Sequence, residues 1–136
     1  MNDFWQKLPK PFFVLAPMAD VTDASFRRMI AKYSRHGEAG GGPDVFWTEF
    51  VAADGLMSPG REVLRHDLKF SEGEHPIVAQ LFGSHIEKME GAARLCAELG
   101  FDGIDINMGC PVRKVVRSGG GSALLCQVDR ARSEER

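Results

Sequence analysis

The sequence DGIDINMGCPVRKVVRSGGGSALL, residues 102–125, contains the features from which the fold can be worked out. Its apolar run stops at Asn107, and Cys110 follows in a turn between a glycine and a proline. Glycine permits a tight turn and proline stiffens it, so the pattern predicts a strand over residues 102–107 that ends directly before the cysteine. A basic, glycine-rich loop comes next, and the leucines at 124–125 indicate the start of another helix.

Working back from this stretch, three earlier segments also have the composition of buried strands. They are FFVLA (12–16), VFWTEF (45–50) and PIVAQLFG (76–83). The first is a continuous apolar run between two prolines, which is typical of a strand buried on both faces. Helical patterns separate the strands, and this alternation predicts an α/β fold with a parallel sheet and helices packed outside it.

The helix after the first strand is predicted to begin at Thr22 as N-cap, with Val21 and Phe26 as a hydrophobic staple. Its apolar stripe comprises Phe26, Met29, Ile30 and Tyr33. The opposite face is interpreted as solvated, with an RNA contact as the alternative; it carries Arg27, Arg28, Lys32 and Arg35.

A second helix is predicted after the third strand. Ser84 and Glu87 have the spacing of a capping box, and Gly100 is placed to end the helix. The apolar face that we expect to be buried comprises Ile86, Met89, Ala93 and Cys96.

Composition and length limit the function classes. The 136 residues are 43% hydrophobic and 26% charged, which is ordinary for one soluble domain, and the net charge of -2 means that any contact with nucleic acid must rest on a local patch. Three cysteines without CxxC spacing predict neither a disulfide framework nor a metal site, and the histidines have no ligand spacing. No apolar run is long enough for a membrane span or a signal peptide, so we expect a cytoplasmic protein.

Polar or unusual residues mark the C-terminal ends of all four predicted strands, where ligands of parallel α/β sheets bind. They are Pro17-Met18-Ala19, Thr48-Glu49, Gln80, and the segment from Asn107 to Cys110. A cysteine is often a small apolar filler, and Cys96 fits that reading, but the exposed turn around Cys110 favours a functional thiol. A nucleophile needs a neighbouring base, whereas a thiol is mostly protonated at neutral pH and can act as a proton donor, which is the simpler role.

The loop after Cys110 has two readings. The stretch SGGGS (118–122) either cradles a phosphate at a helix start or is a mobile loop beside an active site. Arg113, Lys114 and Arg117 give the loop a positive charge that matches a phosphate-bearing partner such as RNA, or they are simply solvated.

Together, LAPMADVTDASFRRM, TEFV, VAQLFGS and GIDINMGCPVRKVVRSGGGSALL resemble successive motifs of the tRNA-dihydrouridine synthases, in order, over residues 12–125. The resemblance implies a (β/α)8 barrel that binds FMN, takes its electrons from NADPH and reduces uridine in tRNA to 5,6-dihydrouridine. It further implies that Pro17, Met18, Ala19 and Gln80 hold the flavin, that Asn107 lies beside flavin and uracil, and that Cys110 donates the proton to C5 of the uracil.

A complete barrel takes about 250 residues, and this chain offers four strands. We therefore expect residues 1–125 to be the N-terminal half of the FMN-binding barrel and residues 126–136 to be an unrelated or disordered tail. Open sheet edges favour self-association. Two alternatives remain at this point: another FMN-dependent barrel that acts on a free pyrimidine, and a non-catalytic fragment.

Overall fold

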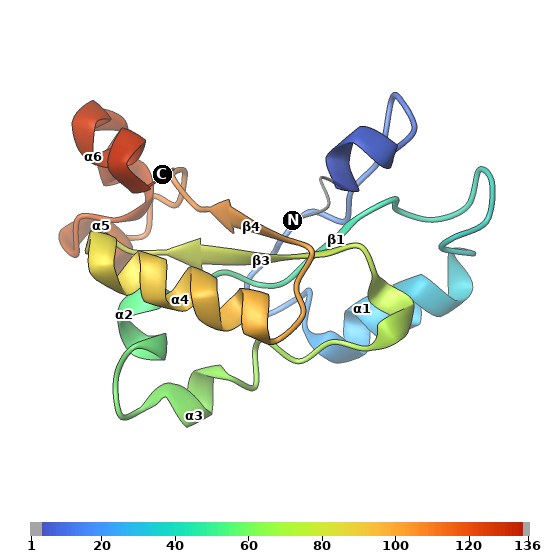
Figure 1. The fold of residues 1–136 in the computed structure, drawn as a ribbon, viewed down its shortest axis with the longest axis horizontal. Helices are drawn as coiled ribbons and strands as arrows, with labels where there is room; N and C mark the ends of the chain where they lie inside the picture. Colours follow the sequence, from blue (N-terminus) through green and yellow to red (C-terminus); the bar gives the residue numbers. More distant parts are fainter. Residues whose placement is uncertain (1–3, 135–136) are drawn as a thin grey trace.

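The fold is built on a four-stranded parallel sheet with β3 at its centre. The computed structural model describes residues 4–134, with strands β1 (Phe46–Trp47), β2 (Val51–Ala52), β3 (Ile77–Phe82) and β4 (Gly103–Ile106). Both β1 and β2 pair with β3 along one edge, and β4 pairs with β3 along the other. All pairings are parallel, so the predicted α/β class is confirmed, and the sheet of the described residues is open rather than closed into a barrel (Figure 1).

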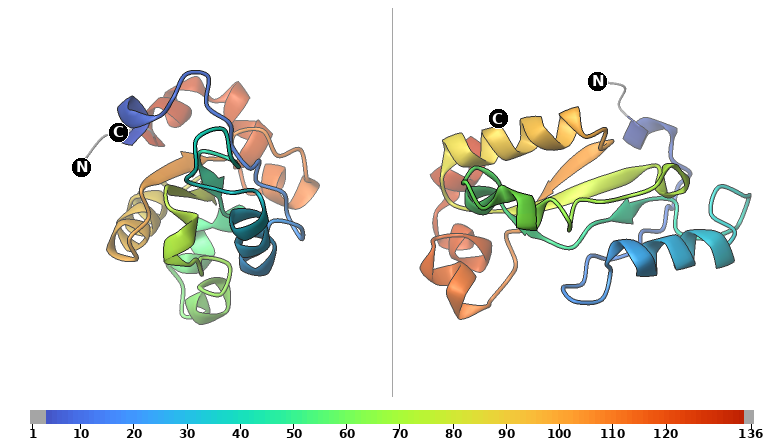
Figure 2. Two further views of the ribbon diagram at one scale, coloured as in Figure 1. Left: turned by 90° about the vertical axis from the view of Figure 1, so that its right-hand side faces the viewer. Right: turned by 90° about the horizontal axis from the view of Figure 1, so that it is seen from below.

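Helices α1, α3 and α4 lie along one side of this sheet, and the N-terminal segment lies on the other (Figure 2). The helices are α1 (Ala24–Tyr33), α2 (Ala53–Leu56), α3 (Arg61–Leu64), α4 (Ile86–Glu98), α5 (Arg113–Arg117) and α6 (Val128–Glu134). Three further turns are 3₁₀ helices: η1 (Phe4–Lys7), η2 (Glu72–Glu74) and η3 (Gly121–Cys126). Both α5 and α6 gather at the end of the sheet to which β3 and β4 point (Figure 1).

The hydrophobic core lies between β3 and the helices. Ile77, Ala79 and Leu81 are fully buried in it, because side chains of a strand alternate between the two faces. The other face of β3 carries Val78 and Gln80. On that face the Val78 side chain and the Phe4 ring both pack against Gly103, which has no side chain of its own. We call this second face of the sheet the inner face.

The first predicted strand, residues 12–16, is reduced to one parallel bridge between Val14 and Val45. Burial on both faces is wrong for this segment, since Phe12 is 40% exposed and Phe13 is 68% exposed. The segment lies at the edge of the sheet, and little of the described chain covers its far side. An apolar run predicts burial, but it does not show whether a neighbour is present to provide it.

The second predicted strand, residues 45–50, is interrupted and extends further than expected. Thr48 lies between β1 and β2, and its Oγ1 atom accepts the backbone N–H of Gln80 at 3.1 Å. A side-chain oxygen thus replaces a backbone carbonyl in the ladder. The third and fourth predicted strands are confirmed, each shortened by one residue at both ends.

Helix α1 begins one residue later than predicted, because Thr22 is engaged elsewhere. The Thr22 hydroxyl accepts the N–H of Met18 at 3.0 Å, and Asp23 caps the helix by accepting the N–H of Phe26 at 2.7 Å. The predicted orientation of the helix is also wrong in part: Met29 is 50% exposed and Tyr33 is 73% exposed, whereas Ile30 packs against the core.

Arg27, predicted on a solvated face, is fully buried. Its guanidinium donates to Glu74 Oε2 at 2.8 Å, to the carbonyl of Thr22 at 2.8 Å and to the carbonyl of Lys69 at 2.5 Å. Glu74 is buried as well, so the charge is paired inside the protein. The face that the sequence predicts to be solvated therefore contributes a buried, hydrogen-bonded arginine at this position.

Helix α4 follows its predicted apolar face at Met89 and Cys96, while Ile86 is 48% exposed. The predicted capping box is wrong: His85 is the N-cap residue, without a side-chain cap, and Ser84 donates its hydroxyl to the carbonyl of Ser118 instead. Gly100 has φ +94 directly after the C-cap, as expected of a residue that ends a helix.

The last part of the chain is more ordered than the sequence indicates. The predicted helix at residues 124–125 is the 3₁₀ helix η3, which begins three residues earlier, at Gly121. The segment expected to be an unrelated or disordered tail contains the helix α6. The remaining tail residues, 135–136, lie outside the described part.

Candidate functional site

The carboxyl ends of β3 and β4 bring Gln80 and Asn107 together on the inner face. The backbone N–H of Asn107 donates to the carbonyl of Leu81 at 2.8 Å, which extends the ladder beyond β4. Its side-chain Nδ2 donates to Gln80 Oε1 at 3.2 Å. These two residues, predicted separately from the sequence, are therefore direct neighbours.

Asp105 and Trp47 belong to the same cluster, and the sequence prediction missed both. Asp105 is the register partner of Gln80 on β4, and its Oδ2 atom accepts Gln80 Nε2 at 2.6 Å and Trp47 Nε1 at 3.2 Å. Gln80 is 8% exposed, so its amide lies almost entirely within this network. The available sequence signal was the alternation of β4, which places residues 103, 105 and 107 on one face.

Cys110 lies in a turn held by the side chain of Asn107. Asn107 Oδ1 accepts the backbone N–H of Gly109 at 3.1 Å and that of Cys110 at 2.9 Å. The carbonyl of Cys110 accepts the N–H of Ser122 at 3.0 Å. Cys110 itself is half-buried. Its backbone is fixed on both sides, by the end of β4 and by the glycine loop.

The glycine loop is a packing element. Gly120 and Gly121 are buried, and a Cβ atom on them would lie 2.9 Å from the carbonyl oxygen of Gly83 and 2.6 Å from that of Cys110, respectively. Gly121 also has a positive φ of +56. Ser84 ties the same loop to β3 through its bond to Ser118. Backbone approaching backbone at these distances requires glycine, which explains this part of the motif without a bound phosphate.

The basic residues Arg113, Lys114 and Arg117 are exposed on α5, which Val115 anchors to the interior. Helix α5 lies at the carboxyl end of the sheet (Figure 1), and in the sequence it comes directly after the turn that holds Cys110. The structure therefore brings this positive charge to the same end of the molecule as the predicted site.

The loop of Pro17, Met18 and Ala19 reaches the same edge through Asp20. Met18 and Ala19 are exposed, and the backbone N–H of Asp20 donates to the Glu49 carboxylate. Since Thr48 is bonded to Gln80, and Gln80 to Asn107, hydrogen bonds connect all four strand ends in order. The strand ends thus lie along one edge of the sheet, and the functional roles of their residues stay predictions.

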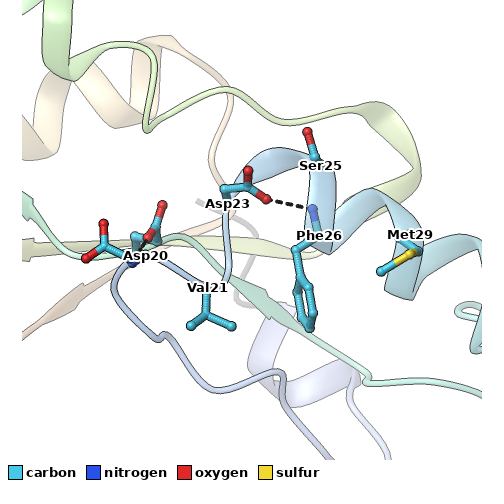
Figure 3. A pocket seen from close by; sticks show the side chains of 7 residues that line it. Asp20, Val21, Asp23, Ser25, Phe26 and Met29 are labelled. Carbon is cyan, nitrogen blue, oxygen red and sulfur yellow. Dashed lines mark hydrogen bonds between the residues drawn. The ribbon is translucent and has the colours of Figure 1, made fainter.

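A pocket of about 550 Å³ opens beside that loop (Figure 3). Its lining includes the side chains of Val21, Phe26 and Met29 together with three carboxylates, Asp20, Asp23 and Glu49. The carboxylates make it unfavourable for an anion such as phosphate. The cluster around Gln80, Asn107 and Cys110 is the better candidate for a catalytic centre.

Among residues 4–134, no group of three or more His, Cys, Asp or Glu side chains is arranged to hold a metal ion. Within the same range, no helix has both the length and the apolar character needed to cross a membrane.

Comparison with known proteins gives one consistent family. The chain is 47% identical over 127 residues to a protein of Bacillus subtilis (strain 168) named "Probable tRNA-dihydrouridine synthase 2". It is 45% identical over 129 residues to a "Probable tRNA-dihydrouridine synthase" of Staphylococcus aureus (strain N315), and 42% identical over 131 residues to one of Staphylococcus epidermidis (strain ATCC 12228 / FDA PCI 1200). These alignments cover 93%, 94% and 96% of this chain, and 37%, 37% and 38% of the relatives.

The chain thus spans little more than a third of the length of the curated relatives that it matches. A sequence model of the family described as Dihydrouridine synthase (Dus) matches residues 14–133, which includes every strand, the turn of Cys110 and most of α6. With this match over most of its length, the chain belongs to the dihydrouridine synthase family.

Proposed function

We propose that this chain forms part of the catalytic site of a tRNA-dihydrouridine synthase, which reduces uridine in tRNA to 5,6-dihydrouridine. The observation that carries the proposal is the continuous hydrogen-bonded edge from Gln80 through Asn107 to Cys110. It unites two of the motifs on which the family resemblance rests, VAQLFGS and the segment that begins GIDINMGCP. The names of the relatives support this substrate over the free pyrimidine of another FMN-dependent barrel.

The kinds of residue at this edge support FMN as the cofactor. An amide nitrogen carries two N–H groups, and Gln80 Nε2 uses one of them for Asp105 among the described residues. The second would donate to a ring carbonyl or nitrogen of the flavin, and the exposed Met18 and Ala19, with Pro17, would contribute apolar surface. Bound FMN, reduced by NADPH, would supply the hydride for C6 of the uracil.

Cys110 would supply the proton for C5 of the uracil. Its backbone is hydrogen-bonded to Asn107 on one side and to Ser122 on the other, so the Cα atom that carries the thiol has a fixed position. Asn107 has a second Nδ2 hydrogen with which to orient the uracil. A positioned acid contributes typically 10²–10⁴-fold to a reaction of this kind.

The tRNA would contact α5 and the turn before it. Arg113, Lys114 and Arg117 are exposed there, and phosphate contacts by such residues position RNA without reading its sequence. A base in folded tRNA must leave its stack to reach the inner face of the sheet. Since the proposed reaction uses tRNA and NADPH, we propose that it takes place in the cytoplasm.

We also propose that the open sheet edges of the chain bind a second copy of the same chain. The chain exposes 8550 Å² at 15.0 kDa. A compact monomer of that mass exposes about 7000 Å², so the excess of about 1500 Å² per chain exceeds the roughly 800 Å² that each partner buries in a standard interface. Phe12, Phe13 and Val14 form the exposed edge.

A chimera tests the proposed function. Residues 1–125 replace the matching segment of the Bacillus subtilis relative, and the purified protein is examined for flavin absorbance and for dihydrouridine formation in tRNA with NADPH. We expect a yellow, active protein, and an inactive one when Cys110 is changed to Ala. A folded, colourless chimera would contradict the assignment of FMN. A yellow chimera that leaves uridine unchanged would contradict the assignment of the reaction.

A further inference from the structure

Asp105 occupies the centre of the inner-face network, and neither the motifs nor the proposed chemistry assigns it a role. It lies half-buried on β4, directly opposite Gln80. Its Oδ2 atom accepts one hydrogen bond from the Gln80 amide at 2.6 Å and one from the Trp47 indole at 3.2 Å. Gln80 is on β3, the neighbour of β4, and Trp47 is on β1 beyond it, so the carboxylate joins β1, β3 and β4 at their inner face.

The carboxylate determines which way the Gln80 amide points. An ionised carboxylate only accepts hydrogen bonds, so Gln80 must turn its Nε2 atom, and not its oxygen, toward Asp105. The oxygen of Gln80 then faces Asn107 and accepts Nδ2 at 3.2 Å.

The orientation of the Gln80 amide in turn restricts the orientation of the Asn107 amide. Because the Nδ2 atom of Asn107 is directed at Gln80, its Oδ1 atom is left to accept the N–H groups of Gly109 and Cys110, at 3.1 and 2.9 Å. If either amide were reversed, oxygen would meet oxygen or N–H would meet N–H along the line. The line of bonds is therefore fixed at both ends, by a carboxylate at Asp105 that only accepts and by the backbone N–H groups of Gly109 and Cys110, which only donate.

We propose that Asp105 is a positioning residue, whose carboxylate orients the amides of Gln80 and Asn107 and thereby holds the turn of Cys110 in place. Its value to catalysis rests on the proposed function, since the two amides and the thiol are the groups assigned to flavin and uracil. The structural part of the proposal stands on the contacts alone.

The three cysteines of the chain can be used to test the proposal by chemical labelling. Cys110 lies in the turn, Cys96 is fully buried, and Cys126 is exposed. The rate of iodoacetamide labelling of each thiol is measured in the 136-residue chain by peptide mass spectrometry. Cys110 reports the turn, Cys96 reports global opening, and Cys126 is the reference. The assay needs neither flavin nor tRNA, so its outcome is independent of the proposed function.

In Asp105→Asn, the side chain can donate as well as accept, and the Gln80 amide is free to turn over. Loss of one amide hydrogen bond, about 1 kcal/mol, corresponds to an approximately fivefold faster labelling of Cys110. We expect that increase with Cys96 still protected and Cys126 unchanged, and we expect Asp105→Glu to restore slow labelling in part. Asp102→Asn is the matched control, because Asp102 bonds His75 and the N–H of Ile77 at the opposite end of β4.

Gln80→Met provides a second test that leaves β4 untouched. It removes the amide between Asp105 and Asn107, and Cys110 labelling should again accelerate about fivefold by the same loss. An unchanged Cys110 rate in Asp105→Asn or in Gln80→Met would overturn the proposal. So would an equal acceleration of Cys96 and Cys110 in both variants, since that pattern marks a merely structural role.

Discussion

Replacing Arg27 by Ala should destabilise the protein more than any surface substitution. Arg27 and Glu74 are both fully buried, and the guanidinium makes three hydrogen bonds, to Glu74, Thr22 and Lys69. After the substitution, the Glu74 carboxylate remains in the interior with the backbone N–H and the hydroxyl of Ser71, each at 2.8 Å, as its partners.

The magnitude follows from the uncompensated charge. Removing one partner of a buried ion pair costs about 3–5 kcal/mol, a large share of the roughly 5–15 kcal/mol by which domains are stable. Replacing both partners by apolar residues is often neutral, so the double variant Arg27→Met, Glu74→Leu should recover most of the loss. The stabilising role of Arg27 would then be to neutralise Glu74 rather than to add free energy of its own.

Urea unfolding followed by circular dichroism measures the effect. The midpoint for Arg27→Ala should fall by roughly 1–5 M, given a loss of about 3–5 kcal/mol and a slope of about 1–3 kcal/mol per M. Arg28→Ala is the matched control, because Arg28 is the next residue on α1 and is exposed, and its effect should stay within about 0.5 kcal/mol. If Arg27→Ala unfolds within about 1 kcal/mol of the unmodified chain, the reasoning from burial is refuted.

In the chimera described above, Cys110→Ala should abolish uridine reduction while NADPH still reduces the flavin. Stopped-flow absorbance measures the two half-reactions separately. An equal loss of both would show that Cys110 is part of the flavin pocket. Burial raises the pKa of Cys96 from 9.0 to about 12, so the thiol stabilises the fold fully below pH 9 and progressively less between pH 9 and 12. The urea midpoint should therefore fall over that range more steeply than in Cys96→Ala, and parallel curves would contradict the cause. The isolated 136-residue chain should scatter light as a dimer or larger and should not reduce tRNA uridine with NADPH and added FMN; an active monomer would show that four strands suffice.

The sequence by itself determined the elements whose signals are local. The apolar runs that become β3 and β4 are bounded by turn residues, and they predicted both strands to within one residue at each end. Because strand ends in a parallel sheet share one edge, the sequence pattern alone predicts Gln80, Asn107 and Cys110 at one site. The same reasoning failed for residues 12–16, since burial at a sheet edge depends on a neighbour and not on the run itself.

The tertiary structure alone decided the partners of the polar groups. Arg27 and Glu74 are separated by 47 residues, Ser84 and Ser118 by 34, and Gln80 and Asp105 by 25. A local pattern can place a side chain on a face, but a hydrogen bond of this kind exists only after the sheet has set its register. For that reason the buried arginine, the close packing of the glycine loop and the central carboxylate of Asp105 could be found in the fold, and not in the order of the residues.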